Sequence, residues 1–253
     1  MKVGINLFSL RHKMTTEADF LETANKLKKM GYDYLQFSGT KFDADMISRV
    51  SLESGMNVHL THVPMERILY DTEKLMEEHA LFGCRNIGLG AMPTEAIRDE
   101  LLFKKTVAQL NEAAEKMEKN GFKFFYHHHH YEFYQHGGET VFDYMIKNAP
   151  SINFTVDTYW LQYGGVSVTD FIAKLSGRIG CVHLKDYRIT FEEDGFKPSI
   201  CAVGDGTIDF TAAVAAAKKS GTEYFFVEQD NAPSFDDPFA QVERSVRYLK
   251  KEI

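Results

Sequence analysis

The sequence predicts an α/β protein that forms a single (β/α)8 TIM barrel over residues 1–253. Three observations support this prediction. The length of 253 residues is close to the usual size of such a barrel. Short apolar segments suited to buried strands recur along the whole chain, and amphipathic segments suited to helices lie between them. This regular alternation favours a parallel sheet that closes on itself.

Eight segments have the apolar, aromatic and β-branched character of buried strands. They are residues 3–9, 33–38, 57–63, 86–90, 123–128, 153–158, 179–184 and 224–229. The clearest amphipathic segments between them are residues 17–30, 73–83 and 102–121. One strand, one helix and two loops need about 30 residues, which agrees with this spacing.

Glycines mark the expected ends of several helices. Gly31, Gly83, Gly121 and Gly221 each come just before a predicted strand, where a left-handed backbone ends a helix. An open, doubly wound sheet would alternate in the same way, but it usually carries a glycine-rich turn after its first strand. Residues 10–19 contain no glycine, and the closed barrel is therefore preferred.

Composition excludes several kinds of partner. The chain is 44% hydrophobic and 26% charged, with a formal charge of −7 and scattered lysines and arginines, so we expect no binding to nucleic acid. No apolar run approaches the roughly 18 residues that a membrane span needs. The three cysteines show no metal-type spacing and no leader precedes the first strand, which indicates a cytoplasmic protein with reduced thiols. A homodimer is the default expectation for its assembly.

Ionisable residues gather where four predicted strands end, at the barrel end that carries active sites. They are His127, His128, His129, His130 and Glu132 after strand 5, Asp157 after strand 6, His183, Lys185 and Asp186 after strand 7, and Glu228 and Asp230 after strand 8. One acid at a strand end is equally well a surface charge or a helix cap. Four such strands together favour one shared site, and imidazoles with carboxylates suit one divalent ion of Mn, Co, Zn or Mg.

The four consecutive histidines continue an apolar strand, whereas a purification tag would lie at a terminus. Side chains alternate along a strand, so only every second histidine points toward the barrel mouth. Either His127 and His129 face inward or His128 and His130 do, and alternation alone leaves both arrangements open.

Five motifs together resemble one protein family. They are YHHHHYEF at 126–133, VDTYW at 156–160, HLKDY at 183–187, VGDGTIDF at 203–210 and VEQD at 227–230. In order and spacing the chain resembles the xylose isomerase-like superfamily of sugar and sugar phosphate isomerases and epimerases, over nearly its whole length. The resemblance implies a barrel enzyme with one metal ion and a small-molecule carbohydrate substrate.

The resemblance also implies a ligand set. The family usually holds its metal with a Glu from strand 5, an Asp from strand 6, a His from strand 7 and a Glu from strand 8. Asp157, His183 and Glu228 match the last three. His127 stands where the epimerases carry the first Glu, which implies that His127 is the fourth ligand and favours His127 and His129 as the inward pair.

The implied chemistry is proton abstraction next to a carbonyl, through a metal-stabilised ene-diolate. Epimerases of the family use the glutamates of strands 5 and 8 as acid and base on opposite faces of the substrate. Glu228 is therefore expected to act as both ligand and base, and His129 is the second candidate for proton transfer.

Four further residues are predicted to contact substrate: His62, Trp160, Lys185 and Arg188. His59 and His62 are three apart in a strand and face opposite sides, so only His62 is assigned to the pocket. Trp160 stands where many family members carry a substrate-binding His, and its indole offers a stacking face. Glu132 is expected to accept a hydrogen bond from a ligand imidazole and so orient it.

The favoured function is a metal-dependent keto-sugar isomerase or epimerase. The alternatives are a lyase or hydrolase-like enzyme that acts on 3-keto-glycosides or inososes by β-elimination, and a sugar-binding barrel without catalysis. An apurinic-site endonuclease is disfavoured, because the chain is acidic and has too few ligands for a metal cluster. Residues 188–206 are long enough for a lid over the barrel mouth or for a solvated excursion.

Overall fold

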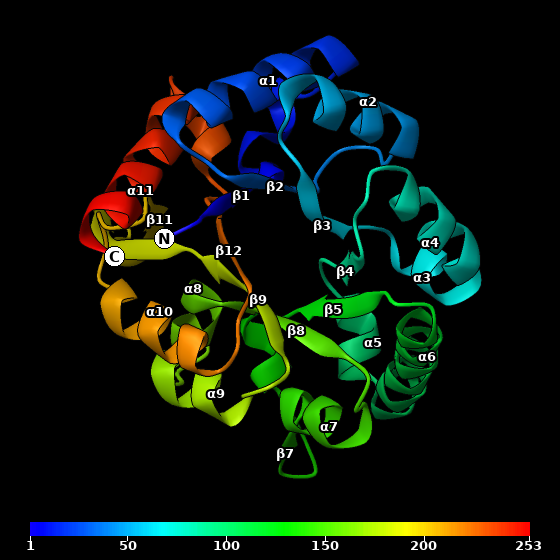
Figure 1. The fold of residues 1–253 in the computed structure, drawn as a ribbon. Coiled ribbons are helices and arrows are strands. Elements are labelled where there is room, and N and C mark those ends of the chain that lie inside the picture. Colours follow the sequence, from blue (N-terminus) through cyan, green and yellow to red (C-terminus); the bar gives the residue numbers. More distant parts are fainter.

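A computed structural model describes residues 1–253 and shows a closed barrel of eight parallel strands surrounded by helices (Figure 1). Around the barrel the strands follow the order β1-β12-β9-β8-β5-β4-β3-β2. The barrel strands are β1 (Gly4–Asn6), β2 (Tyr34–Phe37), β3 (Val58–His62), β4 (Asn86–Leu89), β5 (Lys123–His127), β8 (Asn153–Asp157), β9 (Ile179–Leu184) and β12 (Tyr224–Val227). All eight predicted strands and the predicted fold class are confirmed.

The helices form an outer ring (Figure 1). They are α1 (Glu17–Met30), α2 (Ala44–Ser54), α3 (Met65–Tyr70), α4 (Thr72–Leu81), α5 (Thr94–Arg98), α6 (Glu100–Lys119), α7 (Val141–Asn148), α8 (Thr158–Tyr163), α9 (Val168–Lys174), α10 (Phe210–Lys219) and α11 (Pro238–Glu252). α1 shows how local sequence sets such a helix. Thr16 and Asp19 form a capping box at its start, and Gly31, with a φ of 102°, ends it. The other glycines predicted at helix ends also have positive φ.

All barrel strands except β9 end earlier than predicted, β1 by three residues, β12 by two and the others by one. β1 stops at Asn6 because the Asn6 side chain accepts a hydrogen bond from the Phe8 amide and begins the 3-10 helix η1 (Leu7–Lys13). β5 stops at His127, and a second 3-10 helix, η2 (His130–Phe133), follows within three residues. A third, η3 (Ala232–Ser234), precedes α11. The early stops of β1 and β5 bring polar side chains to the barrel mouth.

The barrel interior is filled in layers. One buried cluster inside it consists of Tyr34, Leu60, Phe125, Cys181 and Phe226. Gly4 and Gly180 leave room for these rings, because a Cβ atom at either position would overlap Tyr34 or Phe125. Since side chains alternate along a strand, the residues two positions further along these strands also point inward, one layer closer to the C-terminal mouth.

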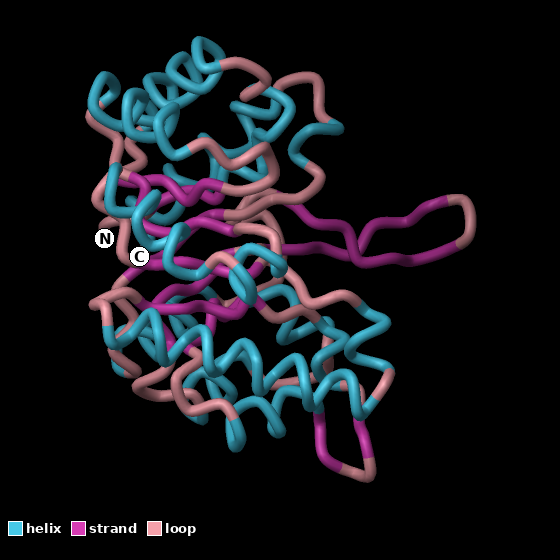
Figure 2. Tube along the Cα trace, turned by 90° about the vertical axis from the view of Figure 1, so that its right-hand side faces the viewer, coloured by secondary structure: helices cyan, strands magenta, loops and turns pink.

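The segment at 188–206 forms a hairpin of two antiparallel strands, β10 (Asp186–Glu192) and β11 (Gly195–Cys201). It projects away from the barrel (Figure 2). Ile189, Phe191, Phe196 and Pro198 lie on one face of it and are exposed. Of the two alternatives left open for this segment, the structure agrees with the solvated excursion and not with the lid, because backbone pairing holds the segment as an outward ribbon. A smaller hairpin, β6 (Gln135–His136) with β7 (Glu139–Thr140), lies outside the barrel too.

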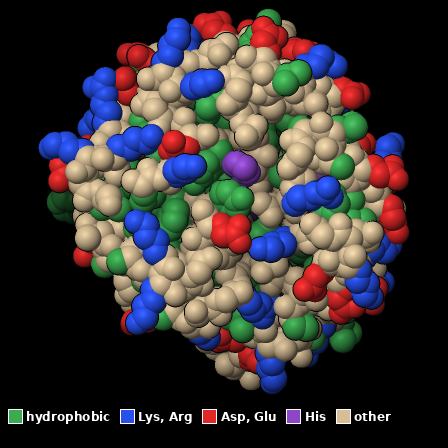
Figure 3. Space-filling view, viewed as in Figure 1, with side chains coloured by type: hydrophobic (Ala, Val, Ile, Leu, Met, Phe, Trp, Pro, Cys, Tyr) green, Lys and Arg blue, Asp and Glu red, His purple; other side chains and the backbone are tan.

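Charges of both signs are mixed over the face seen in Figure 3, and no basic stripe crosses it. None of the helices combines the length and the apolar character that a bilayer span requires. Cys84, Cys181 and Cys201 are buried and form no disulfide, as their odd number and spacing predicted.

Candidate functional site

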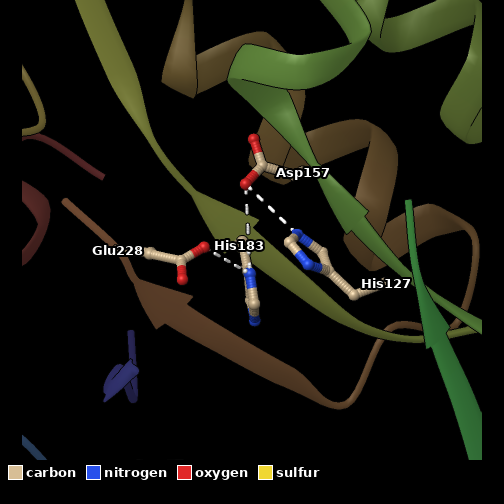
Figure 4. Close-up of side chains that lie close together, drawn as sticks. All are labelled: His127, Asp157, His183 and Glu228. Carbon is tan, nitrogen blue, oxygen red and sulfur yellow. Dashed lines mark ion pairs between the residues drawn. The ribbon is translucent and has the colours of Figure 1, made fainter. Parts of the chain in front are cut away.

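Four buried side chains converge at the C-terminal mouth of the barrel (Figure 4). His127 ends β5, Asp157 ends β8, His183 lies near the end of β9, and Glu228 directly follows β12. One nitrogen or carboxylate oxygen from each lies within 4.8 Å of the others. His127, His183 and Glu228 each stand two positions after a member of the buried interior cluster, namely Phe125, Cys181 and Phe226. Because side chains alternate along a strand, they point into the barrel at its mouth.

Hydrogen bonds to the far side of each ring fix which nitrogen faces the cluster. His127 Nδ1 lies 3.0 Å from the carbonyl oxygen of Gly90, and His183 Nε2 lies 2.7 Å from the side-chain oxygen of Gln36. Both acceptors require the facing nitrogen to carry the proton. Nε2 of His127 and Nδ1 of His183 are therefore left as lone pairs that point into the cluster.

Each carboxylate is also held through one oxygen. Asp157 Oδ1 accepts a hydrogen bond of 3.1 Å from the Trp160 amide at the start of α8. Glu228 Oε1 accepts one of 2.6 Å from the side-chain amide of Asn6. Asp157 Oδ2 and Glu228 Oε2 remain, and both point into the cluster. Two nitrogen and two oxygen atoms are thus presented together by a rigid frame.

The chemistry of these four atoms fits a divalent metal. All four are buried. The two imidazole nitrogens have no hydrogen-bond partner, which is rare for buried polar atoms, and the two carboxylate oxygens have only the Lys185 ammonium, at 3.0 Å. His183 Nδ1 lies only 2.8 Å from Glu228 Oε2, so two lone pairs face each other unless a cation lies between them. Two imidazoles and two carboxylates suit Mn, Co or Zn, and Mg is the harder alternative.

Lys185 lies in the same cluster and is almost fully buried. Its ammonium group is 3.0 Å from both Asp157 Oδ2 and Glu228 Oε2, and 3.1 Å from Asp230 Oδ1. Burial alone would lower the pKa of Lys185, but these carboxylates outweigh it and hold the pKa above its usual value. Lys185 lines the cavity as predicted, yet its charge is paired with the protein's own carboxylates.

His129 lines the cavity beside the cluster. Its ring centroid is 4.7 Å from that of His127, and its Nδ1 lies 3.0 Å from the Tyr131 hydroxyl. Burial lowers the pKa of His129 to about 2, so the ring is neutral near pH 7. His128 points the other way: its Nε2 accepts a hydrogen bond from the Asp157 amide. The structure therefore has the favoured pair, His127 and His129, facing inward.

His62 also lines the cavity. Its ring centroid lies 5.4 Å from that of His127, and the Gln36 amide contacts its Nε2 at 3.1 Å. His59 packs deeper in the barrel, against Tyr34 of the interior cluster and against Tyr224. His62 therefore lines the cavity and His59 does not, but the prediction that they face opposite sides of β3 is wrong, because the pairing of β2 with β3 shifts register at His59.

Trp160 lies on α8 next to His129, with ring centroids 5.2 Å apart. Its indole Nε1 is buried and has no hydrogen-bond partner. The ring stacks on His130. Trp160 therefore stands behind His129 and does not line the cavity, so the predicted substrate contact of its indole is absent from this structure.

The structure contradicts two further predicted placements. Arg188 is exposed on β10 and does not line the cavity, because the hairpin carries it outward. Glu132 contacts no ligand imidazole: its carboxylate accepts a hydrogen bond from the His129 amide and lies 2.6 Å from the Tyr126 hydroxyl. The Gly90 carbonyl orients His127 instead. Burial raises the pKa of Glu132 to about 7.

Asp186, one of the acids at the end of strand 7, has a structural role. Its carboxylate accepts hydrogen bonds from the amides of Gly204, Gly206 and Ile208, at 2.9 to 3.3 Å. It therefore holds the loop after β11 in place and is not directed at the cluster.

Three residues that orient the cluster were missed from the sequence: Asn6, Gln36 and Gly90. Asn6 and Gln36 are polar residues in otherwise apolar strands and are fully buried. The same alternation rule that selected His62 would have found them. Gly90 acts only through its backbone carbonyl, which no side-chain pattern reveals.

Comparison with known proteins places the chain in a family. The profile of the family described as "Xylose isomerase-like TIM barrel" matches residues 24–252. The chain belongs to the xylose isomerase-like TIM barrel family. No curated protein matches this chain significantly.

Solved structures share the fold of this xylose isomerase-like barrel at low sequence identity. A sugar phosphate isomerase/epimerase from Parabacteroides distasonis is 21% identical, with a TM-score of 0.83, covering 99% of this chain and 94% of that chain. An L-ribulose 3-epimerase is 16% identical, with a TM-score of 0.72 and coverages of 99% and 94%. A xylose isomerase-like TIM barrel protein from Mycobacterium smegmatis, in complex with magnesium, is 13% identical, with a TM-score of 0.72 and coverages of 98% and 95%. At these identities the likeness shows the fold alone.

Proposed function

We propose that this protein is a divalent-metal-dependent isomerase or epimerase of keto-sugars. The observation that carries the proposal is the set of four buried ligand atoms from His127, Asp157, His183 and Glu228 that converge at the barrel mouth. Solved structures with the same fold as this chain are named as a sugar phosphate isomerase/epimerase and an L-ribulose 3-epimerase, which supports the choice of reaction class.

The chain's own residues would position the substrate and move the proton. When bound, a divalent ion supplies Lewis acidity toward the carbonyl and hydroxyl oxygens of the substrate. Glu228 is the proposed base, because its side chain lines the cavity and Asn6 orients the carboxylate through Oε1. Burial raises the pKa of Glu228, but Lys185 and His183 lower it by more. The pKa therefore lies well below its usual range, and the carboxylate is ionised.

His129 is the proposed second proton carrier. It lies on the same wall as His127 and is neutral near pH 7, so it has one nitrogen with a proton and one without. When the Tyr131 hydroxyl donates to Nδ1, Nε2 carries the proton and acts as a donor to a substrate oxygen. His62 supplies a further polar contact around the same space.

The test is a product assay in D2O with Mn-loaded protein and D-fructose, followed by NMR. We expect a second sugar that carries deuterium at the reacting carbon. A Glu228→Gln variant should lose about 10² to 10⁴ in rate, as expected for a lost base, while Glu192→Gln on the exposed hairpin should not change it. Release of a leaving group from a 3-keto-glycoside, without a new sugar isomer, would instead favour the lyase alternative.

Two expectations from the sequence stay predictions. A cytoplasmic location would be tested by fractionation of cells that express the protein. A homodimer would be tested by light scattering of the purified protein.

A further inference from the structure

The cavity at the barrel mouth has two unlike walls. It has a volume of about 590 Å³, within the range of pockets that enclose drug-sized ligands. One wall follows β5, β9 and β12 and carries the polar residues His127, His129, Lys185, Glu228 and Asp230. The opposite wall follows β1, β2, β3 and β4. Its apolar members are Phe8, Val63, Pro64, Met65, Leu89, Ala91 and Pro93, and the polar residues Ser38, Thr40, His62 and Glu66 lie among them.

The cavity lining holds more carboxylates than cations. Lys185 is the single lysine or arginine among its eighteen lining residues, and its ammonium is already paired with three carboxylates. Arg11 is close by, but its guanidinium packs over the Phe8 ring at 4.0 Å and donates to the Phe8 carbonyl. Glu66 adds a further carboxylate to the lining. A dianion would meet like charges here, which disfavours its binding.

Backbone amides offer no free phosphate site after β9 either. Loops after the seventh and eighth strands often bind phosphate in such barrels, through amides that point at the ligand. In the glycine-rich loop after β11, the backbone amides of Gly204, Gly206 and Ile208 donate hydrogen bonds to the Asp186 carboxylate. A side chain of the protein thus fills the place that an anion would take.

We infer that the substrate is an unphosphorylated keto-sugar whose non-reacting end carries an apolar group. This inference rests on the proposed function and names the substrate class for the same site. The sugar hydroxyls and carbonyl face the histidine and carboxylate wall. The apolar group lies against Phe8, Met65 and Pro93, where removal of its surface from water favours binding.

The experiment uses Mn-loaded protein and measures incorporation of solvent deuterium into four probes by NMR. The first pair is D-fructose and D-fructose 6-phosphate. The second pair is the methyl and the phenyl β-glycoside of 3-keto-D-glucose. We expect kcat/KM for D-fructose to be at least 100-fold higher than kcat/KM for D-fructose 6-phosphate. We expect kcat/KM for the phenyl glycoside to be at least 10-fold higher than kcat/KM for the methyl glycoside.

A Met65→Ala variant sharpens the test of the apolar wall. It should reduce the preference for phenyl over methyl several-fold and leave the metal content unchanged, whereas Met46→Ala on α2, outside the cavity lining, should change neither. Equal or faster exchange with the 6-phosphate, or no preference for the phenyl group, would overturn the inference and leave the proposed function standing. Exchange with none of the four probes would overturn both.

Discussion

The side-chain oxygen of Gln36 on β2 lies 2.7 Å from Nε2 of His183 on β9, across the barrel mouth. The same amide group contacts Nε2 of His62 through its nitrogen, at 3.1 Å. Gln36 therefore sets the proton position on His183 and leaves Nδ1 free to bind a cation. Residues that orient a ligand imidazole in this way are worth about 10- to 100-fold in metal affinity.

A Gln36→Met variant tests this relationship. Methionine keeps the size of the side chain but removes the acceptor, so we expect metal affinity to fall by about 10- to 100-fold. Titration calorimetry with Mn would measure it. Gln109→Met on α6 is the matched control. Unchanged affinity in a folded Gln36→Met protein would show that the hydrogen bond does not orient His183.

Lys185 should compete with the metal for the same oxygens. Its ammonium lies 3.0 Å from Asp157 Oδ2 and from Glu228 Oε2. Lys185→Met leaves these buried carboxylates without a partner, and such losses cost about 3 to 5 kcal/mol of stability. We expect the Lys185→Met protein to have a low Tm without metal. Added Mn should raise the Tm of this variant by more than it raises the Tm of the wild type.

Thermal melting with and without Mn measures this difference. Lys197→Met on the exposed hairpin serves as the control. The competition is refuted if Mn raises the Tm of Lys185→Met and of the wild type by the same amount.

His79 on α4 should make stability depend on pH away from the metal site. Its ring is fully buried, with Nε2 2.7 Å from the Thr61 hydroxyl and Nδ1 2.7 Å from the Leu75 carbonyl. Burial lowers the pKa of His79 from 6.5 to about 4. Between these values the unfolded chain binds a proton at this ring and the folded chain does not. The free energy of unfolding should therefore fall as the pH is lowered through this window, by about 3 kcal/mol in total.

Urea unfolding of the wild type and of His79→Gln between pH 7 and pH 4 measures this contribution. The variant should lose that part of the pH dependence, and His12→Gln at an exposed position should keep it. Parallel pH profiles for the wild type and His79→Gln would count against a buried neutral ring.

Asp186 and Asp157 should respond differently to the loss of their charge. Asp186→Ala leaves the amides of Gly204, Gly206 and Ile208 without their acceptor, which should cost roughly 2 to 3 kcal/mol of stability. Its metal content should stay stoichiometric. Asp157→Ala should lose the metal. The two variants would be compared by elemental analysis and urea unfolding, and metal loss in Asp186→Ala would contradict the structural role.

The strand positions could be predicted because apolar strand segments alternate with amphipathic helix segments along the sequence. The meeting of ionisable residues at the barrel mouth followed from the same pattern, and the family resemblance implied which four of them are ligands. His127, Asp157, His183 and Glu228 each follow or end an apolar strand, and the barrel brings those ends together. Family resemblance then selected His127 over His128, a choice that alternation had left open.

The errors have a common physical cause. The partners of a side chain depend on tertiary geometry that the local pattern does not encode. Arg188 follows the same strand end as Lys185, yet backbone pairing in the hairpin directs it outward, while the Lys185 ammonium turns into the carboxylates. Glu132 caps η2 because its carboxylate reaches the His129 amide first. Gln36 stands at an inward position that alternation does mark, but its hydrogen bond to His183 crosses the barrel mouth and depends on the same tertiary geometry.

Metal content by elemental analysis of the wild type, His127→Ala and Glu228→Ala tests the central claim most directly. The account predicts one divalent ion per chain in the wild type and loss of that ion in both variants, which should remain folded by circular dichroism. A wild-type protein that contains no metal and takes up no added Mn, Co or Zn would contradict it.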